Sequence, residues 1–179
     1  KLKSKIKKKR DRYKMFLFMG SVDRKNFSLK ILKLLDSKLF LKYKILAIIG
    51  SNNAQKGLIK KYVKFVKNVK IIKKDNINLK PIYDKINFVI SAGGVTMYEL
   101  LFYGFKPIVF PQNETQFEIS KSLSKSNYVH LMNIESKKIK MNLFKILKNN
   151  QNFLNKSKRK SINKFITHGS KNIVNIISP

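Results

Sequence analysis

The sequence has no cysteine, no tryptophan and only two histidines among its 179 residues. Without cysteine, disulfide bonds, thiolate catalysis and thiolate metal sites are excluded. His130 and His168 lie far apart and have no carboxylate at the spacing of metal ligands, so we expect no metal site. No nucleophile, acid or base stands in a recognisable catalytic arrangement. We therefore predict no catalytic residue and no cofactor within this chain.

Acidic residues are scarce as well, with 9 Asp and Glu against 40 Lys and Arg and a net charge of +31. Such a charge favours polyanionic ligands and by itself points to nucleic acid or an anionic membrane. Nucleic-acid surfaces, however, use arginine for bidentate contacts, and most basic residues here are lysines. Lysine, asparagine and isoleucine are abundant throughout, as in proteins encoded by AT-rich genomes. We expect no specific nucleic-acid partner.

Long hydrophobic runs are also missing. No uninterrupted apolar stretch approaches the ~20 residues of a membrane-spanning helix, although hydrophobic residues make up 43% of the chain. We expect no membrane span and a cytoplasmic protein. Residues 1–13 form a basic run with little apolar pattern, which predicts a linker or the end of a missing N-terminal domain. Residues 14–179 are long enough for one folded domain.

Apolar runs alternate along the chain with segments whose apolar residues have helical spacing. The runs are continuous, which is typical of parallel strands covered on both faces. We therefore predict an α/β fold with one doubly wound, mostly parallel, Rossmann-like sheet. The expected strands are residues 15–19, 45–49, 69–72, 88–91, 106–110 and 128–132. The expected helices include residues 27–35, 58–65, 76–85, 116–125, 139–147 and 153–165, one that ends at Gly104, and a last segment after Gly169.

Ligands of such sheets bind outside the carboxyl ends of the strands, near a switch in strand order. The loops expected at that edge are residues 20–26, 50–53, 73–75, 91–96 and 111–116. Three of them, 20–26, 91–96 and 111–116, contain the small and polar residues that a nucleotide requires.

The most informative stretch runs from a buried apolar strand at residues 88–91 through Gly93 and Gly94 into a helix. Backbone N–H groups at a helix start, and the positive end of the helix dipole, suit a phosphate. Glycine permits the close approach of a phosphate oxygen and a turn with positive φ. Thr96 could cap the helix or donate to the anion, and Glu99 could close a capping box or accept hydrogen bonds from a ribose. The alternative is a tight turn before a well-capped helix.

The loop that follows the first strand, residues 20–26, is a second candidate. Gly20 and Ser21 come directly after the strand, where their backbone amides could reach a diphosphate or a sugar. The alternative is a plain turn in which Asn26 caps the next helix and Asp23 is a surface carboxylate. The residues alone leave both interpretations open.

The loop at residues 111–116 is the third candidate, because four polar side chains follow a strand there. Gln112, Asn113, Glu114 and Gln116 supply a dense set of hydrogen-bond donors and acceptors. The alternative is a solvated loop whose polar side chains cap the next helix.

Three stretches, residues 19–26, 90–100 and 112–116, occur in this order and are followed by His-Gly-Ser at residues 168–170. In this order the sequence resembles the C-terminal domain of the UDP-sugar hydrolases of pseudaminic acid biosynthesis and of spore-coat polysaccharide proteins. These proteins are relatives of the GT-B glycosyltransferases and of the glycosyltransferase family 28 C-terminal domains. The resemblance covers about residues 13–177.

The resemblance implies the C-terminal half of a GT-B fold, with residues 14–179 as a nucleotide-sugar-binding domain. The diphosphate would face the two glycines together with Val95 and Thr96, Glu99 would hold the ribose hydroxyls, and Gln116 and its neighbours would line the sugar or phosphate side. The implied substrate-binding residues are Gly20, Ser21, Asp23, Asn26, Gly93, Gly94, Val95, Thr96, Glu99, Gln112, Asn113 and Gln116.

The function expected from this resemblance is the UDP-sugar-binding domain of a hydrolase that removes UDP from a 2,4-diacetamido-2,4,6-trideoxyhexose. The reaction would supply pseudaminic-type nonulosonic acid synthesis for a surface glycan. We expect the family's N-terminal domain, with its catalytic histidine, as a partner, and no efficient turnover by this chain alone. The alternatives are the donor-binding domain of a glycosyltransferase that uses a UDP-sugar and a non-enzymatic polyanion-binding module.

Overall fold

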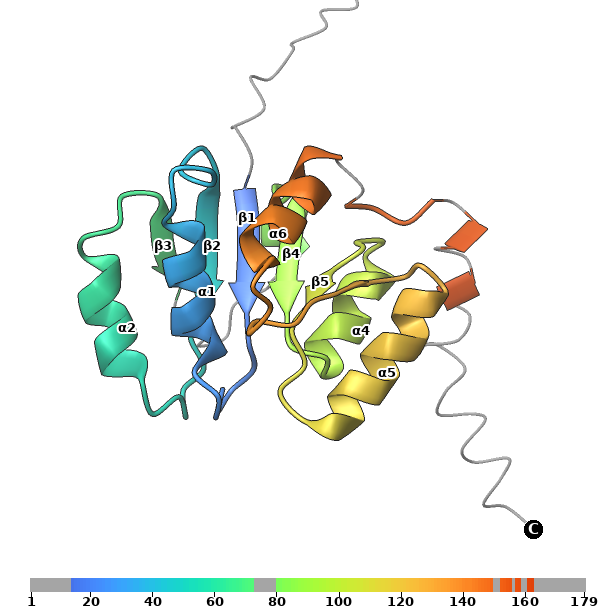
Figure 1. Cartoon of the computed structure of the whole chain (residues 1–179), viewed down its shortest axis with the longest axis horizontal. Helices are drawn as coiled ribbons and strands as arrows, with labels where there is room; N and C mark the ends of the chain where they lie inside the picture. Colours follow the sequence, from blue (N-terminus) through green and yellow to red (C-terminus); the bar gives the residue numbers. More distant parts are fainter. Residues whose placement is uncertain (1–13, 73–79, 150–151, 156, 159–160, 163–179) are drawn as a thin grey trace, which may run out of the picture.

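The computed structural model describes residues 14–72, 80–149, 152–155, 157–158 and 161–162 (Figure 1). Within them, one sheet holds six parallel strands in the order β3-β2-β1-β4-β5-β6. The strands are β1 (Lys14–Phe18), β2 (Lys44–Ile48), β3 (Val69–Ile72), β4 (Phe88–Ser91), β5 (Ile108–Val109) and β6 (His130–Leu131). The strand order reverses between β1 and β4. This topology confirms the predicted doubly wound, parallel α/β sheet.

Helices cover both faces of this sheet. The helices of the described residues are α1 (Phe27–Leu35), α2 (Lys56–Val63), α3 (Lys80–Tyr83), α4 (Val95–Phe102), α5 (Glu114–Lys125) and α6 (Ile139–Lys148). One face packs against α1, α2 and α6, which share a single apolar cluster with it. The other face packs against α3 and α4, and α5 joins α4 in a further cluster. In Figure 1, α1 and α6 lie in front of the sheet.

β1 lies between β2 and β4, and its side chains alternate between the two helical layers. Met15 and Leu17 belong to the cluster under α1, α2 and α6, whereas Phe16 and Phe18 pack with residues of α3 and α4. All four side chains are buried. Burial on both faces explains why this strand is apolar at every position of its central run.

The strand register brings the two ends that flank the reversal to the same level. Phe18, the last residue of β1, pairs with Ile48 of β2 and with Ser91 of β4. The segments that leave β1 and β4 therefore start side by side at the carboxyl edge of the sheet. Doubly wound sheets bind their ligands at this position, so the two loops that begin there are the candidate binding loops.

β5 is shorter than the strand predicted at residues 106–110, because the backbone before it pairs with a segment from later in the chain. The Lys106 N–H donates to the Asn152 carbonyl at 2.7 Å, and the Leu154 N–H donates to the Gly104 carbonyl at 2.9 Å. β6 is likewise confined to two residues of its predicted run. Both strands nevertheless fall within their predicted residue ranges.

The helix predicted at residues 153–165 is wrong at its start. Phe153 forms an antiparallel bridge with Phe105, and the rings of the two residues lie 5.1 Å apart. The described helical residues of this region are 157–158 and 161–162. Apolar spacing alone could not show that Phe153 packs on an aromatic partner far away in the sequence.

Several predictions fall outside the described residues. These are the basic run at 1–13, the loop at 73–75, His168 and the segment after Gly169. The helix predicted at 76–85 is described only as the short α3. Within the described part of the chain, no helix is both long and apolar enough to cross a membrane.

Candidate functional site

A pocket of about 240 Å³, here termed the switch-point pocket, lies where β1 and β4 end. The turn after β1, the start of α4 and one side chain of α5 form its walls. The lining residues are Phe18, Met19, Gly20, Ser21, Ala92, Gly94, Val95, Thr96 and Gln116. The structure therefore brings residues from all three predicted loops into one pocket.

The first turn of α4 contributes backbone donors to this pocket. Gly94 occupies the N-cap position in an extended conformation, and no side chain caps the helix. The N–H groups of Val95 and Thr96 precede the first hydrogen bond of the turn, which Met97 donates to the Gly94 carbonyl at 2.9 Å. Such N–H groups have no partner within the helix and lie at the positive end of its dipole. This is the arrangement expected for an anion site.

Three predictions for this turn are wrong. Thr96 does not cap α4, because the helix begins at Val95 and Thr96 is its second residue. Glu99 is the fifth residue, so it stands too far along the helix for a capping box, which joins the N-cap to the third helical residue. The expected positive φ is also wrong, since neither Gly93 nor Gly94 adopts one.

Packing, rather than turn conformation, requires glycine at position 93. A Cβ atom on Gly93 would lie 2.7 Å from the Ser120 Oγ and 3.0 Å from the Gln116 backbone oxygen, both on α5. Ser120 is fully buried, so the contact could not be relieved by a surface side chain moving aside. A Cβ atom on Gly94 would meet only the Gln116 Nε2 at 3.8 Å. Gly93 thus sets the spacing to α5, and Gly94 leaves the pocket wall open.

Asp23 organises the loop after β1. Its carboxylate is buried and accepts hydrogen bonds from the N–H groups of Phe27 and Ser28, both at 2.8 Å, and from the Asn53 Nδ2 at 3.3 Å. Asp23 therefore caps α1, and the interpretation as a surface carboxylate is wrong. Asn26 occupies the N-cap position in a left-handed conformation with φ 54°, but its side chain makes no capping bond. The capping role predicted for Asn26 is wrong.

The loops after β1 and β2 fit closely together. Gly20 has a φ of 89°, a conformation that other residues rarely adopt. A Cβ atom on Gly50 would overlap the Ser21 carbonyl, so the second loop can approach only because residue 50 is a glycine. With the bond between Asp23 and Asn53, this contact fixes the Gly20–Ser21 backbone along the wall of the switch-point pocket.

A second pocket, of about 400 Å³, continues from the first along the same edge. The two pockets share part of the turn after β1 and the side chain of Gln116. The second pocket is lined by Met19, Gly20, Ser21, Val22, Asp23, Arg24, Lys25, Gln112, Asn113 and Gln116. The loop at residues 111–116 thus lies opposite the loop after β1, as its place after β5 predicted.

Hydrogen bonds hold the loop at residues 111–116 in place. Asn113 caps α5, because its Oδ1 accepts a bond from the Gln116 N–H at 2.8 Å. The Gln116 Oε1 accepts a bond from the Gln112 N–H at 3.0 Å, and the Gln112 Nε2 donates to the Met19 carbonyl. The capping interpretation of this loop is therefore confirmed, with α5 starting two residues earlier than predicted.

Glu99 lies one turn along α4 from Thr96, which lines the switch-point pocket. It is half-buried on α4, near the Tyr83 hydroxyl on α3. Burial, and then the neighbouring Glu99 carboxylate, raise the pKa of Tyr83 above its usual value. Glu99, Gly93 and Asn26 do not line either of the two pockets described above. The binding roles of all twelve predicted residues remain predictions.

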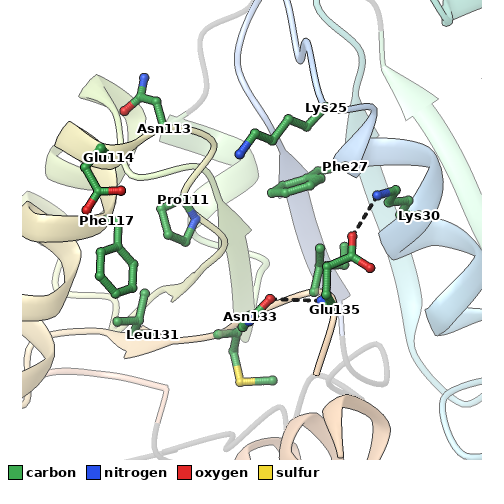
Figure 2. Close-up of a pocket in the computed structure, with 12 residues that line it drawn as sticks. Lys25, Phe27, Lys30, Pro111, Asn113, Glu114, Phe117, Leu131, Asn133 and Glu135 are labelled. Carbon is green, nitrogen blue, oxygen red and sulfur yellow. Dashed lines mark hydrogen bonds and ion pairs between the residues drawn. The ribbon is translucent and has the colours of Figure 1, made fainter. Parts of the chain in front are cut away.

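A third and larger pocket, of about 670 Å³, adjoins the second and shares Lys25 and Asn113 with it. We term it the aromatic pocket. Figure 2 shows Phe27 and Phe117 on opposite sides, with the ion pair of Lys30 and Glu135 at one edge. Its lining is Lys25, Phe27, Lys30, Pro111, Asn113, Glu114, Phe117, Leu131, Met132, Asn133, Ile134 and Glu135.

The end of β6 and the loop after it supply residues 131–135 of the aromatic pocket, which were not among the predicted site residues. The signal was present, since a strand was expected at residues 128–132 and its carboxyl end had to reach the same edge as the others. For metals, the described residues contain no group of three or more His, Cys, Asp or Glu side chains that could hold an ion.

Comparison with known families identifies the domain. Residues 14–174 match the family model of the glycosyltransferase family 28 C-terminal domain. The chain belongs to this family. The match confirms the predicted relation to family 28, and it favours the glycosyltransferase alternative over the pseudaminic acid hydrolase. No curated protein matches the sequence of this family 28 domain.

Solved structures share the fold of the family 28 domain. MurG from Acinetobacter baumannii has a TM-score of 0.60 at 13% identity, covering 87% of this chain and 47% of that chain. The glycotransferase of kitacinnamycin has a TM-score of 0.57 at 13% identity, covering 87% of this chain and 39% of that chain. The family 28 domain thus spans half or less of the length of these structures. It has the Rossmann-like fold of GT-B C-terminal domains.

Proposed function

We propose that this family 28 domain binds the UDP-sugar donor of a glycosyltransferase, with the diphosphate in the switch-point pocket. The observation that supports this most is the uncapped start of α4, whose Val95 and Thr96 amides belong to residues lining that pocket. A diphosphate there would accept hydrogen bonds from these amides and from the Thr96 hydroxyl. The helix dipole would stabilise the charge that UDP gains when the glycosidic bond breaks.

In this proposal, four neighbouring side chains orient the donor. Glu99, one turn along α4, would accept hydrogen bonds from the ribose hydroxyls. Gln112 and Asn113 line the second pocket, so the sugar would extend there and toward the aromatic pocket. Gln116 lines both smaller pockets and would contact the junction of phosphate and sugar. The backbone of this site is fixed before binding, which lowers the entropy lost when the donor is ordered.

The proposal assigns the acceptor and the catalytic base to a second domain. The solved structures that share this fold are at least twice as long as the part that this chain covers. A transfer reaction requires donor, acceptor and base to be held together in one cleft. In this proposal the chain supplies the donor half, and the predicted N-terminal domain supplies the rest.

A second candidate function is the donor half of a hydrolase that releases UDP from a diacetamido-trideoxyhexose. The order of the stretches 19–26, 90–100 and 112–116 supports it, because that order resembles the pseudaminic acid hydrolases. Both candidates place UDP in the same pocket, and they differ in whether water or another molecule accepts the sugar. The localisation predicted for either is cytoplasmic.

The direct test of donor binding is calorimetric titration of the chain with UDP, CDP and tripolyphosphate at ~150 mM salt, where exposed charges are largely screened. We expect saturable binding of UDP that is stronger than binding of the other two. Equal binding of all three that fades as salt rises would contradict the proposal. That result would support the polyanion-binding module instead, because non-specific attraction by lysines depends steeply on salt.

A variant of Glu99 tests the position of the ribose. Glu99→Gln should weaken UDP binding by ~1–3 kcal/mol, because the charge-assisted hydrogen bonds to the ribose become neutral ones. Glu118→Gln is the control, since Glu118 is an exposed residue of α5 outside the three pockets. Unchanged UDP affinity in Glu99→Gln would show that the ribose lies elsewhere.

A further inference from the structure

α2 lies at the end of the molecule that is formed by the edge strand β3 (Figure 1). Ile59 is its only buried residue among those described. Exposed side chains of α2 and of the two residues that follow it form what we term the α2 outer face. These are Leu58, Lys60, Lys61, Lys64 and Phe65, all of them exposed.

Two large apolar side chains stand out on this face. Leu58 is 54% exposed and Phe65 is 85% exposed. Leu58 lies in the first turn of α2, and Phe65 lies in the turn that follows the helix, next to the C-cap residue Lys64. Lys60, Lys61 and Lys64 lie between them in the sequence. A pair of exposed apolar side chains among lysines is the pattern of a basic amphipathic surface.

The charge around this face has one sign. No acidic residue occurs between Asp36 and Asp75, whereas lysines recur throughout that interval. Asp36 itself accepts a hydrogen bond from the Tyr62 hydroxyl at 2.8 Å. The surface of α5 differs, because there Glu118 pairs with Lys121. The described residues 37–72 are therefore positive and carry no carboxylate, and the nearby Asp23, which contacts Asn53 before α2, is buried.

We propose that the α2 outer face docks on the surface of an anionic lipid bilayer. The lysines would lie at the level of the lipid phosphates, and Leu58 and Phe65 would enter the boundary between headgroups and acyl chains. Lysine attraction alone would suit any polyanion. The exposed leucine and phenylalanine favour lipid, because transfer of these side chains out of water is favourable only where an apolar phase is available. This interaction goes beyond donor binding and does not depend on it.

The absence of tryptophan from the sequence allows a site-specific test with the full chain. Phe65→Trp places a single fluorophore on the α2 outer face. Met141→Trp is the matched control, because Met141 is 55% exposed and lies on α6 next to Lys140. With vesicles of equal parts phosphatidylglycerol and phosphatidylcholine, we expect a blue shift for Trp at 65 and quenching by brominated acyl chains. Trp at 141 should show neither.

Co-sedimentation gives a second readout that does not rely on tryptophan. The double variant Leu58→Ser, Phe65→Ser should bind the same vesicles roughly tenfold more weakly, because two apolar side chains are lost without a change of charge. Met141→Ser should bind as the unmodified chain does. UDP titration of the double variant should be unchanged, which separates a failure of this proposal from a failure of donor binding.

Three outcomes would overturn the proposal. One is a Trp at 65 whose emission does not move when the chain binds anionic vesicles. Another is an equal shift at 65 and 141, which would mean binding without a defined face. The third is a shift at 65 with polyuridylic acid but not with vesicles, which would assign the α2 outer face to single-stranded nucleic acid, where aromatic side chains stack on bases.

Discussion

The buried carboxylate of Asp23 joins three segments of the chain. It accepts bonds from the first turn of α1 and from Asn53 in the loop after β2, and it belongs to the loop that follows β1. Hydrogen bonds to an ionised group are stronger than neutral ones, and here they offset the cost of burying the charge. Since Gly20 and Ser21 precede Asp23 by only a few residues, the same bonds fix the wall of the switch-point pocket.

Replacing this carboxylate should therefore lower stability markedly. We expect Asp23→Ala to reduce the free energy of unfolding by ~2–3 kcal/mol, because α1 loses its cap and two backbone donors lose a charged acceptor. Urea unfolding followed by circular dichroism measures this. Asp84→Ala, at an exposed position, is the control and should unfold like the unmodified chain. Equal urea midpoints for the two variants would contradict the role assigned to Asp23.

At the scale of secondary-structure elements, the candidate site depends on how closely the β4–α4 turn approaches α5. Gly93 permits that approach, and Asn113 starts α5 at the right residue by capping it. Gln116, in the first turn of α5, then lines the pocket opposite the start of α4. The two helix starts and the turn after β1 therefore form one unit, and a change in their spacing should affect the fold before it affects a ligand.

A pair of substitutions separates packing from binding at this turn. Gly93→Ala should cost ~1–3 kcal/mol of stability, because the new methyl group overlaps atoms of α5 and forces a backbone shift. Gly94→Ala should leave the urea midpoint nearly unchanged, because its methyl group finds an ordinary contact distance. It should nevertheless weaken UDP binding, since the methyl group stands in the pocket wall. Equal destabilisation by both variants would show that the turn tolerates neither.

The sequence was sufficient where one physical signal dominated. The buried strands were predicted because a parallel strand covered on both faces must be apolar at successive positions, as in β1. The carboxyl-edge loops followed from the expectation that the strands are parallel. The sequence was insufficient where two residues could fill the same role. Asp23 and Asn26 both precede α1 and could cap it, and the partner Asn53 is brought to Asp23 only by the fold. The reason for Gly93 and the pairing of Phe153 likewise depend on partners distant in sequence.

At the scale of the whole molecule, charge is the dominant feature. The chain carries +31, and the ion pairs that are formed by Lys30 with Glu135 and by Lys121 with Glu118 are both exposed. Exposed pairs contribute little to stability. Most lysines therefore repel one another in the folded state, and a net charge this far from zero disfavours a compact structure.

Screening this repulsion should stabilise the domain. We expect the thermal midpoint to rise as sodium chloride increases from ~10 to ~300 mM, because the Debye length falls well below the size of the molecule. A gain of about 1 kcal/mol would correspond to a rise of ~2–4 °C for a domain of this length. Potassium chloride is the control and should act equally if screening is the cause. A midpoint that stays constant or falls would contradict this account.

The pairing of residues 152–154 with the start of β5 has a consequence for how the protein is made. The Gly104 carbonyl and the Lys106 N–H pair with Leu154 and Asn152, about fifty residues later in the chain. During synthesis, β1, β2 and β3 can pair as they emerge from the ribosome, because each follows its neighbour by a short interval, and β4 can join β1 once residue 91 has emerged. The edge that begins at β5 can be completed only after residue 154 has been translated and released from the exit tunnel. Until then Phe105, which also packs against Tyr83, lacks its contact with Phe153.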